Sequence, residues 1–406
     1  MTMFRLLCLC FGLLSLPFLV AEATETATNT ADDSTPERDS LLKIWEVDRT
    51  CASEVQYMED SMEIALEIVI ATLAALEYIK SSDRPSKQQD PKRYYRFTSI
   101  WKSCQAFLGF EPAKDPGHLQ SAIDIFAKIK RTIPASENDP VKGYVVHFQK
   151  LPNHKPKLMC GDSPSEDSWK WYGASDTIPG QGQNLMNMND DFREYAYDSY
   201  DGAWYYDRIF AGVAWDKDII IFCDNQFTPK AKASKTPKAW KASGISEGLS
   251  LNAYKDHLSV VMVHEMIHWF GGTVSKGAKP VARINDQTAI DANGLLIYKG
   301  REKEFAYKSV PSADEVKKNS LEPVLAYGME RVWQLAFCGR KPVQDHCGTE
   351  KAMHNADSLA LFALAMYYED WGWSHSVARV PGKDYKKDNS KKRPGGKQGQ
   401  RPPKVA

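Results

Sequence analysis

The sequence predicts an α+β protein, mostly helical with a small twisted sheet. Apolar residues recur at helical spacing over residues 40–80, and residues 94–107 and 119–133 show two further helical patterns. Residues 218–223 (Asp-Ile-Ile-Ile-Phe-Cys) form a continuous β-branched run, which is typical of a buried strand. A second strand is expected at residues 143–149. Helices therefore dominate, and the few strands form a small sheet among them.

Composition narrows the class of protein. The chain has 406 residues, of which 43% are apolar and 11% aromatic, so it is not a wholly disordered chain. The 52 basic and 52 acidic side chains cancel. Nucleic-acid binding needs a strong positive excess, so we expect no nucleic-acid partner.

The first residues have the layout of a secretory signal. Arg5 precedes an apolar run, and Ala21-Glu22-Ala23 forms a small-x-small cleavage site. The apolar run is too short for a membrane span. The other long apolar stretch, residues 62–79, carries three glutamates and is expected to be a core helix. The sequence therefore predicts a signal peptide over residues 1–23, a secreted extracellular protein and no membrane span.

Removal of the signal leaves six cysteines. An even number in a secreted chain predicts three disulfide bonds. Cys338 and Cys347 enclose a short loop, so we expect these two to pair. The other pairings stay open.

The chemistry is concentrated in a helix expected from about Asp256 to Phe270. It contains His264, Glu265 and His268 in a His-Glu-x-x-His pattern. This spacing places both imidazoles on one helix face, where they can share one Zn²⁺, and it places the glutamate where it can activate water. His257 lies outside the pattern and is expected at the surface.

A zinc site needs a third protein ligand. The two glycines that end the helix, Gly271 and Gly272, are not followed by a histidine three residues on, so a carboxylate is expected. Several carboxylates follow the motif in the sequence.

The order of motifs resembles the deuterolysin-type aspzincins, a family of secreted fungal metalloendopeptidases with lysine-specific members. The family carries His-Glu-x-x-His, then Gly-Thr-x-x-Asp-x-x-Tyr-Gly, then a helix that begins Asn-Ala-Asp. This chain has the first motif at 264–268, Ala-Tyr-Gly at 326–328 and Asn-Ala-Asp at 355–357. A strand candidate at 219–223 precedes the first motif, as in the family. The resemblance covers residues 218–368.

The resemblance implies a zincin-like metallopeptidase domain with one Zn²⁺ per chain. His264 and His268 would bind the metal, Glu265 would be the general base and Tyr327 would stabilise the oxyanion. Asp357 would cap its helix or orient a ligand. Val324 stands where the family has its zinc-binding aspartate, so we favour Glu322, at an expected helix start, as the third ligand. The alternatives, in order, are Asp286, then Asp291 and Glu304.

The domain boundaries follow from these features. A polar linker (24–39) precedes the metallopeptidase domain (40–380), which comprises a helical N-terminal part (40–135) and a catalytic part (about 218–370). Residues 381–406 are expected to be a disordered basic tail, because nine Lys or Arg against two Asp lie between 383 and 406 without apolar periodicity. We expect this tail either to be simply solvated or to bind polyanions through its positive charge.

The favoured function is a secreted, monomeric zinc metalloendopeptidase that cleaves polypeptides, bound in extended form along an edge strand. If it selects lysine, Asp190, Asp191, Glu194 and Asp198 are candidate partners of the substrate. The alternative is a catalytically inactive secreted binding or effector protein on the same scaffold. A third reading, carbohydrate binding, rests on the aromatic-rich segment 161–217.

Overall fold

The computed structural model describes most of the domain. Two compact units divide the chain, Met1–Arg38 and Asp39–Ala406, and every described residue belongs to the second. The described residues are 45–130, 157–161, 211–214, 219–271, 273–274, 280–282, 284–301, 303–337 and 346–381. The predicted signal, linker, strand at 143–149 and basic tail lie outside them, as does nearly all of the aromatic-rich segment.

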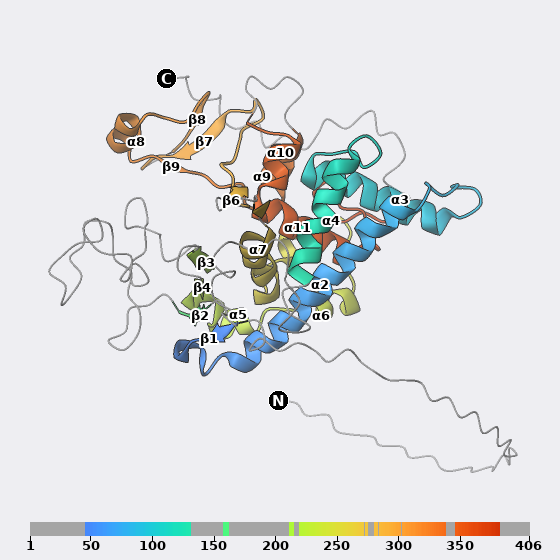
Figure 1. Cartoon of the computed structure of the whole chain (residues 1–406), viewed down its shortest axis with the longest axis horizontal. Coiled ribbons are helices and arrows are strands. Elements are labelled where there is room, and N and C mark those ends of the chain that lie inside the picture. The colour runs from blue at the N-terminus through green and yellow to red at the C-terminus, as the bar shows by residue number, and fades with distance from the viewer. Residues whose placement is uncertain are drawn as a thin grey trace, which may run out of the picture. The chain divides into compact units, whose positions relative to one another are not determined.

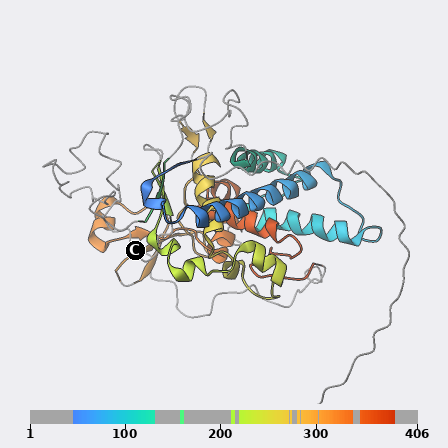
Figure 2. The same cartoon turned by 90° about the horizontal axis from the view of Figure 1, so that it is seen from below.

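Four helices build the core. They are α2 (Val55–Ser81), α4 (Pro116–Lys130), α7 (Leu258–Gly271) and α11 (Ala356–Tyr367), and each of the other three lies against α2 (Figures 1 and 2). All residues of α11 are buried, which fits a sequence that is apolar on every side. The helical patterns predicted over residues 40–80 and 119–133 are confirmed by α2 and α4 where these helices lie. The start of the first prediction is wrong, because Glu46–Val47 is strand β1 and α2 begins only at Val55.

The third predicted helix is α3 (Pro91–Ser103), which continues into a π-helical turn, Cys104–Leu108. The Asp90 side chain caps it by accepting a hydrogen bond from Arg93 N. The helix ends at Gly109, whose φ of +77° suits glycine. The segment adds a further helical layer against α2 and α11.

The main sheet has four strands in the order β1 (Glu46–Val47), β2 (Lys157–Cys160), β4 (Ile219–Phe222) and β3 (Ala211–Ala214). The pairs β1–β2 and β2–β4 are parallel, whereas β3 pairs antiparallel with β4 and lies at the edge. The strand predicted at residues 218–223 is β4, so that prediction is confirmed. The edge strand β3 lies against α7.

The cysteines differ from the expectation of three disulfides. A disulfide joins Cys51, in a 3₁₀ turn after β1, to Cys160 at the end of β2, because the pairing of β1 with β2 brings these points together. Cys104 and Cys223 are buried thiols. Cys104 lies in the π-helical turn, and Cys223 follows the last residue of β4. Cys347 is disulfide-bonded. Cys338 lies outside the described residues, so its pairing stays a prediction.

Short helices connect β4 to α7. They are a 3₁₀ turn Asp224–Gln226, α5 (Pro229–Lys232), α6 (Pro237–Ser243) and a 3₁₀ turn Leu251–Tyr254. Both α5 and α6 begin with a threonine cap followed by proline, an arrangement that favours the start of a helix. After α7, β5 (Thr273–Val274) pairs with β6 (Pro280–Ala282).

A three-stranded sheet follows and belongs to what we call the inserted module, residues 290–323. It contains β7 (Leu296–Lys299), β8 (Glu304–Tyr307), α8 (Ala313–Asn319) and β9 (Glu322–Pro323), with strand order β8-β7-β9. The module has an apolar cluster of its own, formed by Ile290, Leu296, Tyr298 and Leu321. The chain then returns to the core through α9 (Met329–Phe337), α10 (Thr349–Met353) and α11. None of the described helices combines the length and apolarity of a membrane span.

Candidate metal centre

The helix α7 presents both predicted histidines on one face. The Nε2 atoms of His264 and His268 lie 3.1 Å apart, as expected for residues one turn apart. At the start of the helix, Ser259 N donates to His257 Nδ1 at 3.2 Å. His257 is buried, and burial lowers its pKa to about 4. The expectation that His257 lies at the surface is therefore wrong, because its ring fixes the first turn of α7.

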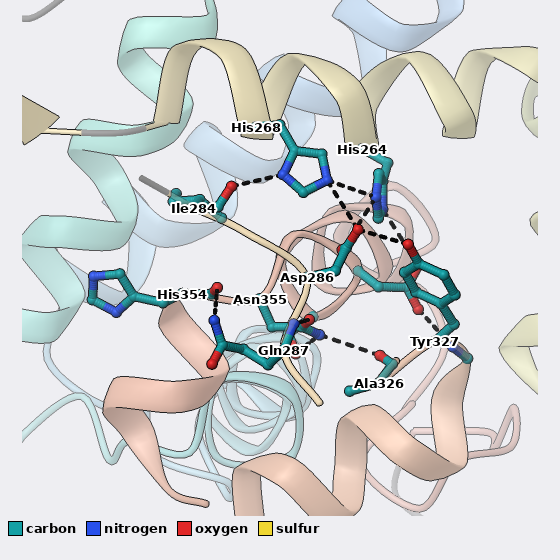
Figure 3. A network of polar contacts seen from close by, with 12 residues as sticks. His264, His268, Ile284, Asp286, Gln287, Ala326, Tyr327, His354 and Asn355 are labelled. Carbon is teal, nitrogen blue, oxygen red and sulfur yellow. Dashed lines mark hydrogen bonds and ion pairs between the residues drawn. The ribbon is translucent and has the colours of Figure 1, made fainter. Parts of the chain in front are cut away.

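Asp286 completes a triangle with the two imidazoles (Figure 3). Its Oδ1 lies 3.4 Å from His264 Nε2, and its Oδ2 lies 3.3 Å from His268 Nε2. Two ligand atoms of a tetrahedral zinc ion, each about 2.0–2.1 Å from the metal, are separated by roughly 3.3–3.4 Å. Within the described ranges, these three residues are the one group of His, Cys, Asp or Glu placed to hold a metal ion.

The outer nitrogens of both rings are engaged elsewhere. His268 Nδ1 lies 2.6 Å from the carbonyl oxygen of Ile284 and must donate to it, because a carbonyl only accepts. His264 Nδ1 faces Asp357 Oδ1 at 3.6 Å. Such contacts turn Nε2 of both rings towards Asp286, the orientation that a shared metal ion would require.

The Ile284 side chain packs against the end of α7. A Cβ on Gly271 would lie 2.5 Å from Ile284 Cδ1 and 3.3 Å from Ile125 Cγ2. Glycine therefore leaves room for these two side chains at the helix end. The end of the helix agrees with the sequence-based prediction.

The donor set fits a divalent cation. Asp286 Oδ1 is buried and makes no hydrogen bond. A buried carboxylate oxygen in this state is costly, and a cation between the two imidazoles would satisfy it. Two imidazoles and one carboxylate form the ligand set of many zinc sites with an open coordination position.

Electrostatics prepare the carboxylate for this role. Burial would raise the pKa of Asp286, but the imidazoles of His268 and His264 outweigh it and hold the pKa well below its usual value. Burial lowers the pKa of His264, yet Asp286 and Asp357 outweigh it and hold that pKa well above its usual value. Asp286 is thus an anion, and a metal ion would have to displace a proton from His264.

Glu265 follows the first histidine in α7 and is 4% exposed. Burial raises the pKa of its carboxyl group, while the charges of His264 and His268 oppose this shift. The buried glutamate expected beside the two histidines is therefore present. A raised pKa suits a carboxylate that has to accept a proton.

Tyr327 contacts both Asp286 and His264. Its hydroxyl donates to Asp286 Oδ2 at 2.6 Å, and its ring meets the His264 ring edge-on at 5.8 Å (Figure 3). The residue as a whole is 43% exposed, so one side of the ring faces solvent. Burial of the hydroxyl, together with Asp286, raises the Tyr327 pKa well above its usual value, which keeps this group a proton donor.

The favoured third ligand, Glu322, lies elsewhere. It belongs to β9 and stands opposite Lys299 of β7, whereas the sequence suggested the start of a helix. A proline directly after it is tolerated because β9 is an edge strand. Among the described residues, Glu322 is not part of the His264, His268 and Asp286 group.

The two remaining alternatives also have other roles. Asp291 Oδ1 accepts hydrogen bonds from the backbone N–H groups of Asn293 and Leu295, and so holds a turn. Glu304 pairs with Arg331 at 3.0 Å. Asp286, ranked second from the sequence, is therefore the carboxylate that the fold brings to the histidines.

Asp357 supports the site from the first turn of α11. Its Oδ2 accepts a hydrogen bond of 2.6 Å from Gly328 N, and its Oδ1 faces His264. Burial would raise its pKa, but Lys255 and His264 outweigh this effect and hold the pKa of Asp357 below its usual value, so the carboxylate stays charged. Of the two roles expected for Asp357, the structure favours orientation of a ligand, because the cap position itself belongs to Asn355.

Asp286 and Tyr327 meet because the chain pairs with itself around the inserted module. Ala326 N donates to Gln287 O at 2.8 Å, and Thr288 forms a bridge with Leu325. The inserted module separates Asp286 and Tyr327 in the sequence but not in space, so spacing in the sequence could not identify Asp286.

Comparisons with known proteins add no relative. No protein-family model matches the chain, and no curated protein or solved structure matches it. The geometry of the site is therefore the evidence that bears on function.

Proposed function

We propose that this protein is a secreted zinc metalloendopeptidase. The observation that carries the proposal is the triangle of His264, His268 and Asp286. The two Nε2 atoms lie 3.1 Å apart, and each lies 3.3–3.4 Å from one oxygen of the Asp286 carboxylate. Two further observations support it: Glu265 is buried in the same helix, and Tyr327 offers a protonated hydroxyl beside Asp286. The resemblance of the motif order to the aspzincins agrees with this arrangement.

Each residue then has a chemical task. A zinc ion held by the three ligands would make a water molecule more acidic and polarise the carbonyl group to be attacked. Glu265 accepts the proton of the attacking water and later passes it to the leaving amine. Tyr327 turns from Asp286 to donate to the oxyanion that develops on the carbonyl. Asp357 keeps the His264 ring in the orientation that exposes Nε2.

The proposed substrate is an extended polypeptide. The strand β3 is antiparallel and forms the edge of the main sheet, next to α7. Main-chain groups at a sheet edge can pair with an added strand. Substrate bound in this way would run alongside the helix that carries the metal ligands.

The test uses the full secreted chain and the variant Glu265→Gln. Wild-type protein should carry one Zn²⁺ per chain and hydrolyse an unfolded protein. Glu265→Gln should keep zinc and fold but lose hydrolysis, since glutamine has the shape of glutamate without its ability to accept the proton. Metal analysis and a peptidase assay provide the two readouts.

Two results would contradict the proposal. Absence of zinc from protein prepared without chelator would remove the metal centre altogether. Zinc binding without cleavage in a broad peptide screen would leave the alternative, a non-enzymatic secreted binding protein on the same scaffold.

Two further parts of the proposal concern partners. The basic tail is proposed to contact polyanions. The protein is proposed to be a monomer, which size-exclusion chromatography can check.

A further inference from the structure

Asn355 precedes α11 and is fully buried. Asparagine at this N-cap position usually accepts a hydrogen bond from its own helix. Here the side chain accepts no such bond from the backbone of α11. Its amide donates to Ser358 Oγ in the first turn of that helix, but its other two contacts go to distant segments of the chain, so capping alone does not account for it.

The amide group has one acceptor and two donated hydrogens, and all three are used. Its Oδ1 accepts from Gln287 N at 2.9 Å. Its Nδ2 donates to Ala326 O at 3.2 Å and to Ser358 Oγ at 2.9 Å. These contacts fix the orientation of the amide, because the N–H of Gln287 needs an acceptor and the carbonyl of Ala326 needs a donor.

Two of these partners are immediate neighbours of site residues. Gln287 follows Asp286, and Ala326 precedes Tyr327. The amide of Asn355 therefore bridges the segment that carries the carboxylate and the segment that carries the hydroxyl (Figure 3).

The backbone around Asn355 strengthens the same connection. Asn285 and Asn355 form a parallel bridge, and Ala356 N donates to Asn285 O at 3.3 Å. The side chain of Gln287 returns the contact by donating to His354 O at 3.0 Å. Residues 354–356 thus run alongside residues 285–287 and fix the position of Asp286 from the side opposite to the histidines.

We propose that Asn355 is a positioning residue for the metal centre. Its amide sets the distance between Asp286 and Tyr327 and ties both to α11, which carries Asp357 two residues further on. The inference rests on the proposed metal site. The inference adds that contacts with the start of α11 hold Asp286, the proposed third ligand, in place. In the sequence, Asp286 and α11 are separated by the inserted module, α9 and α10.

The experiment measures zinc affinity by chelator competition for wild type, Asn355→Ala and Asn355→Asp. Loss of contacts that orient metal ligands typically costs about 10–100-fold in affinity, and we expect this for Asn355→Ala. Asn355→Asp keeps an oxygen acceptor opposite Gln287 N but cannot donate to Ala326 O. It should bind zinc more tightly than Asn355→Ala and still hydrolyse peptides more slowly than wild type.

The visible absorption of Co²⁺-substituted protein provides a readout that is independent of activity. The bands should shift in Asn355→Ala, because the Asp286 ligand is displaced. A matched control is Thr72→Val, since Thr72 is also fully buried and its hydroxyl contacts the carbonyl of Ala363 in α11, away from the site. This variant should lose thermal stability without a change in zinc affinity or in the Co²⁺ spectrum.

The outcomes separate the inference from the proposed function. If wild type binds zinc and Asn355→Ala binds it equally well with an unchanged Co²⁺ spectrum, the positioning role is wrong and the metal centre stands. If Asn355→Ala does not fold, Asn355→Asp decides, and wild-type affinity together with wild-type turnover in that variant overturns the inference. If wild type binds no zinc, the proposed function fails first.

Discussion

Tyr327 and Asp286 are 41 positions apart in the chain, and the Tyr327 hydroxyl donates to Asp286 Oδ2 at 2.6 Å. The same carboxylate faces both imidazoles of α7. One hydrogen bond therefore links the proposed third metal ligand to the proposed oxyanion donor. A change on either side should be measurable on the other.

Replacement of Tyr327 by phenylalanine should separate turnover from metal binding. The variant keeps the ring against His264 but loses the hydroxyl. We expect zinc to remain bound and kcat to fall by about 10²–10³, the usual effect of losing an oxyanion donor. Steady-state kinetics and metal analysis decide this. Unchanged kcat would assign Tyr327 a purely structural role.

Asp286→Ala should abolish tight zinc binding, because it removes the carboxylate that completes the ligand triangle. Glu322→Ala is the matched control, since Glu322 lies in β9 opposite Lys299. Its zinc content and activity should equal those of wild type. Isothermal titration of zinc into both apo variants tests the assignment, and the reverse pattern of affinities would restore Glu322 as the ligand.

His257 should make the protein sensitive to acid. Its pKa falls to about 4 in the folded state through burial, against about 6.5 when unfolded. Between these values the unfolded chain binds more protons, so the free energy of unfolding decreases as pH falls. The loss from this one group amounts to about 3 kcal/mol.

The measurement is denaturant unfolding of wild type and His257→Asn at pH 7 and pH 4. Asparagine can still accept from Ser259 N but does not titrate. The difference in unfolding free energy between the two pH values should therefore be smaller in the variant. An equal difference in both proteins would show that His257 does not contribute to acid sensitivity.

The Cys51–Cys160 disulfide closes a loop across a sequence separation of 109. Its removal by a Cys51→Ala, Cys160→Ala double variant should lower the free energy of unfolding by about 2–5 kcal/mol. Cys104 and Cys223, as buried thiols, should react with an alkylating reagent only after unfolding. Peptide mapping under non-reducing conditions checks the pairing, and a Cys104–Cys223 cross-link would contradict it.

Local patterns predicted much of the described fold. The helical periodicity of α2, α3 and α4 and the β-branched run of β4 are signals contained within single segments. The His264 and His268 pair was also predictable, because the relation depends only on the pitch of one helix. In each of these cases the information lies within a single helix or strand.

The third ligand could not be predicted in the same way. Glu322 is closer than Asp286 to Tyr327 in the sequence. The pairing of β9 with β7, however, places the Glu322 side chain beside Lys299 of β7 and not beside the histidines. Asp286 reaches the histidines through the pairing of Gln287 with Ala326, a contact between distant segments. The burial of His257 and the role of Asn355 likewise depend on partners from the folded chain. No periodicity in the sequence marks such partners.

The inserted module leaves and rejoins the core at neighbouring points, where Thr288 forms a bridge with Leu325. Loop-closure cost rises only slowly with length, so the size of this excursion has little influence on the pairing at its base. We therefore expect an engineered chain with a longer or shorter segment 290–323 to keep the geometry of Asp286 and Tyr327. A chain in which a tight turn replaces the module would contain the aspartate and tyrosine close together in sequence, and it would be the compact counterpart of the site described here.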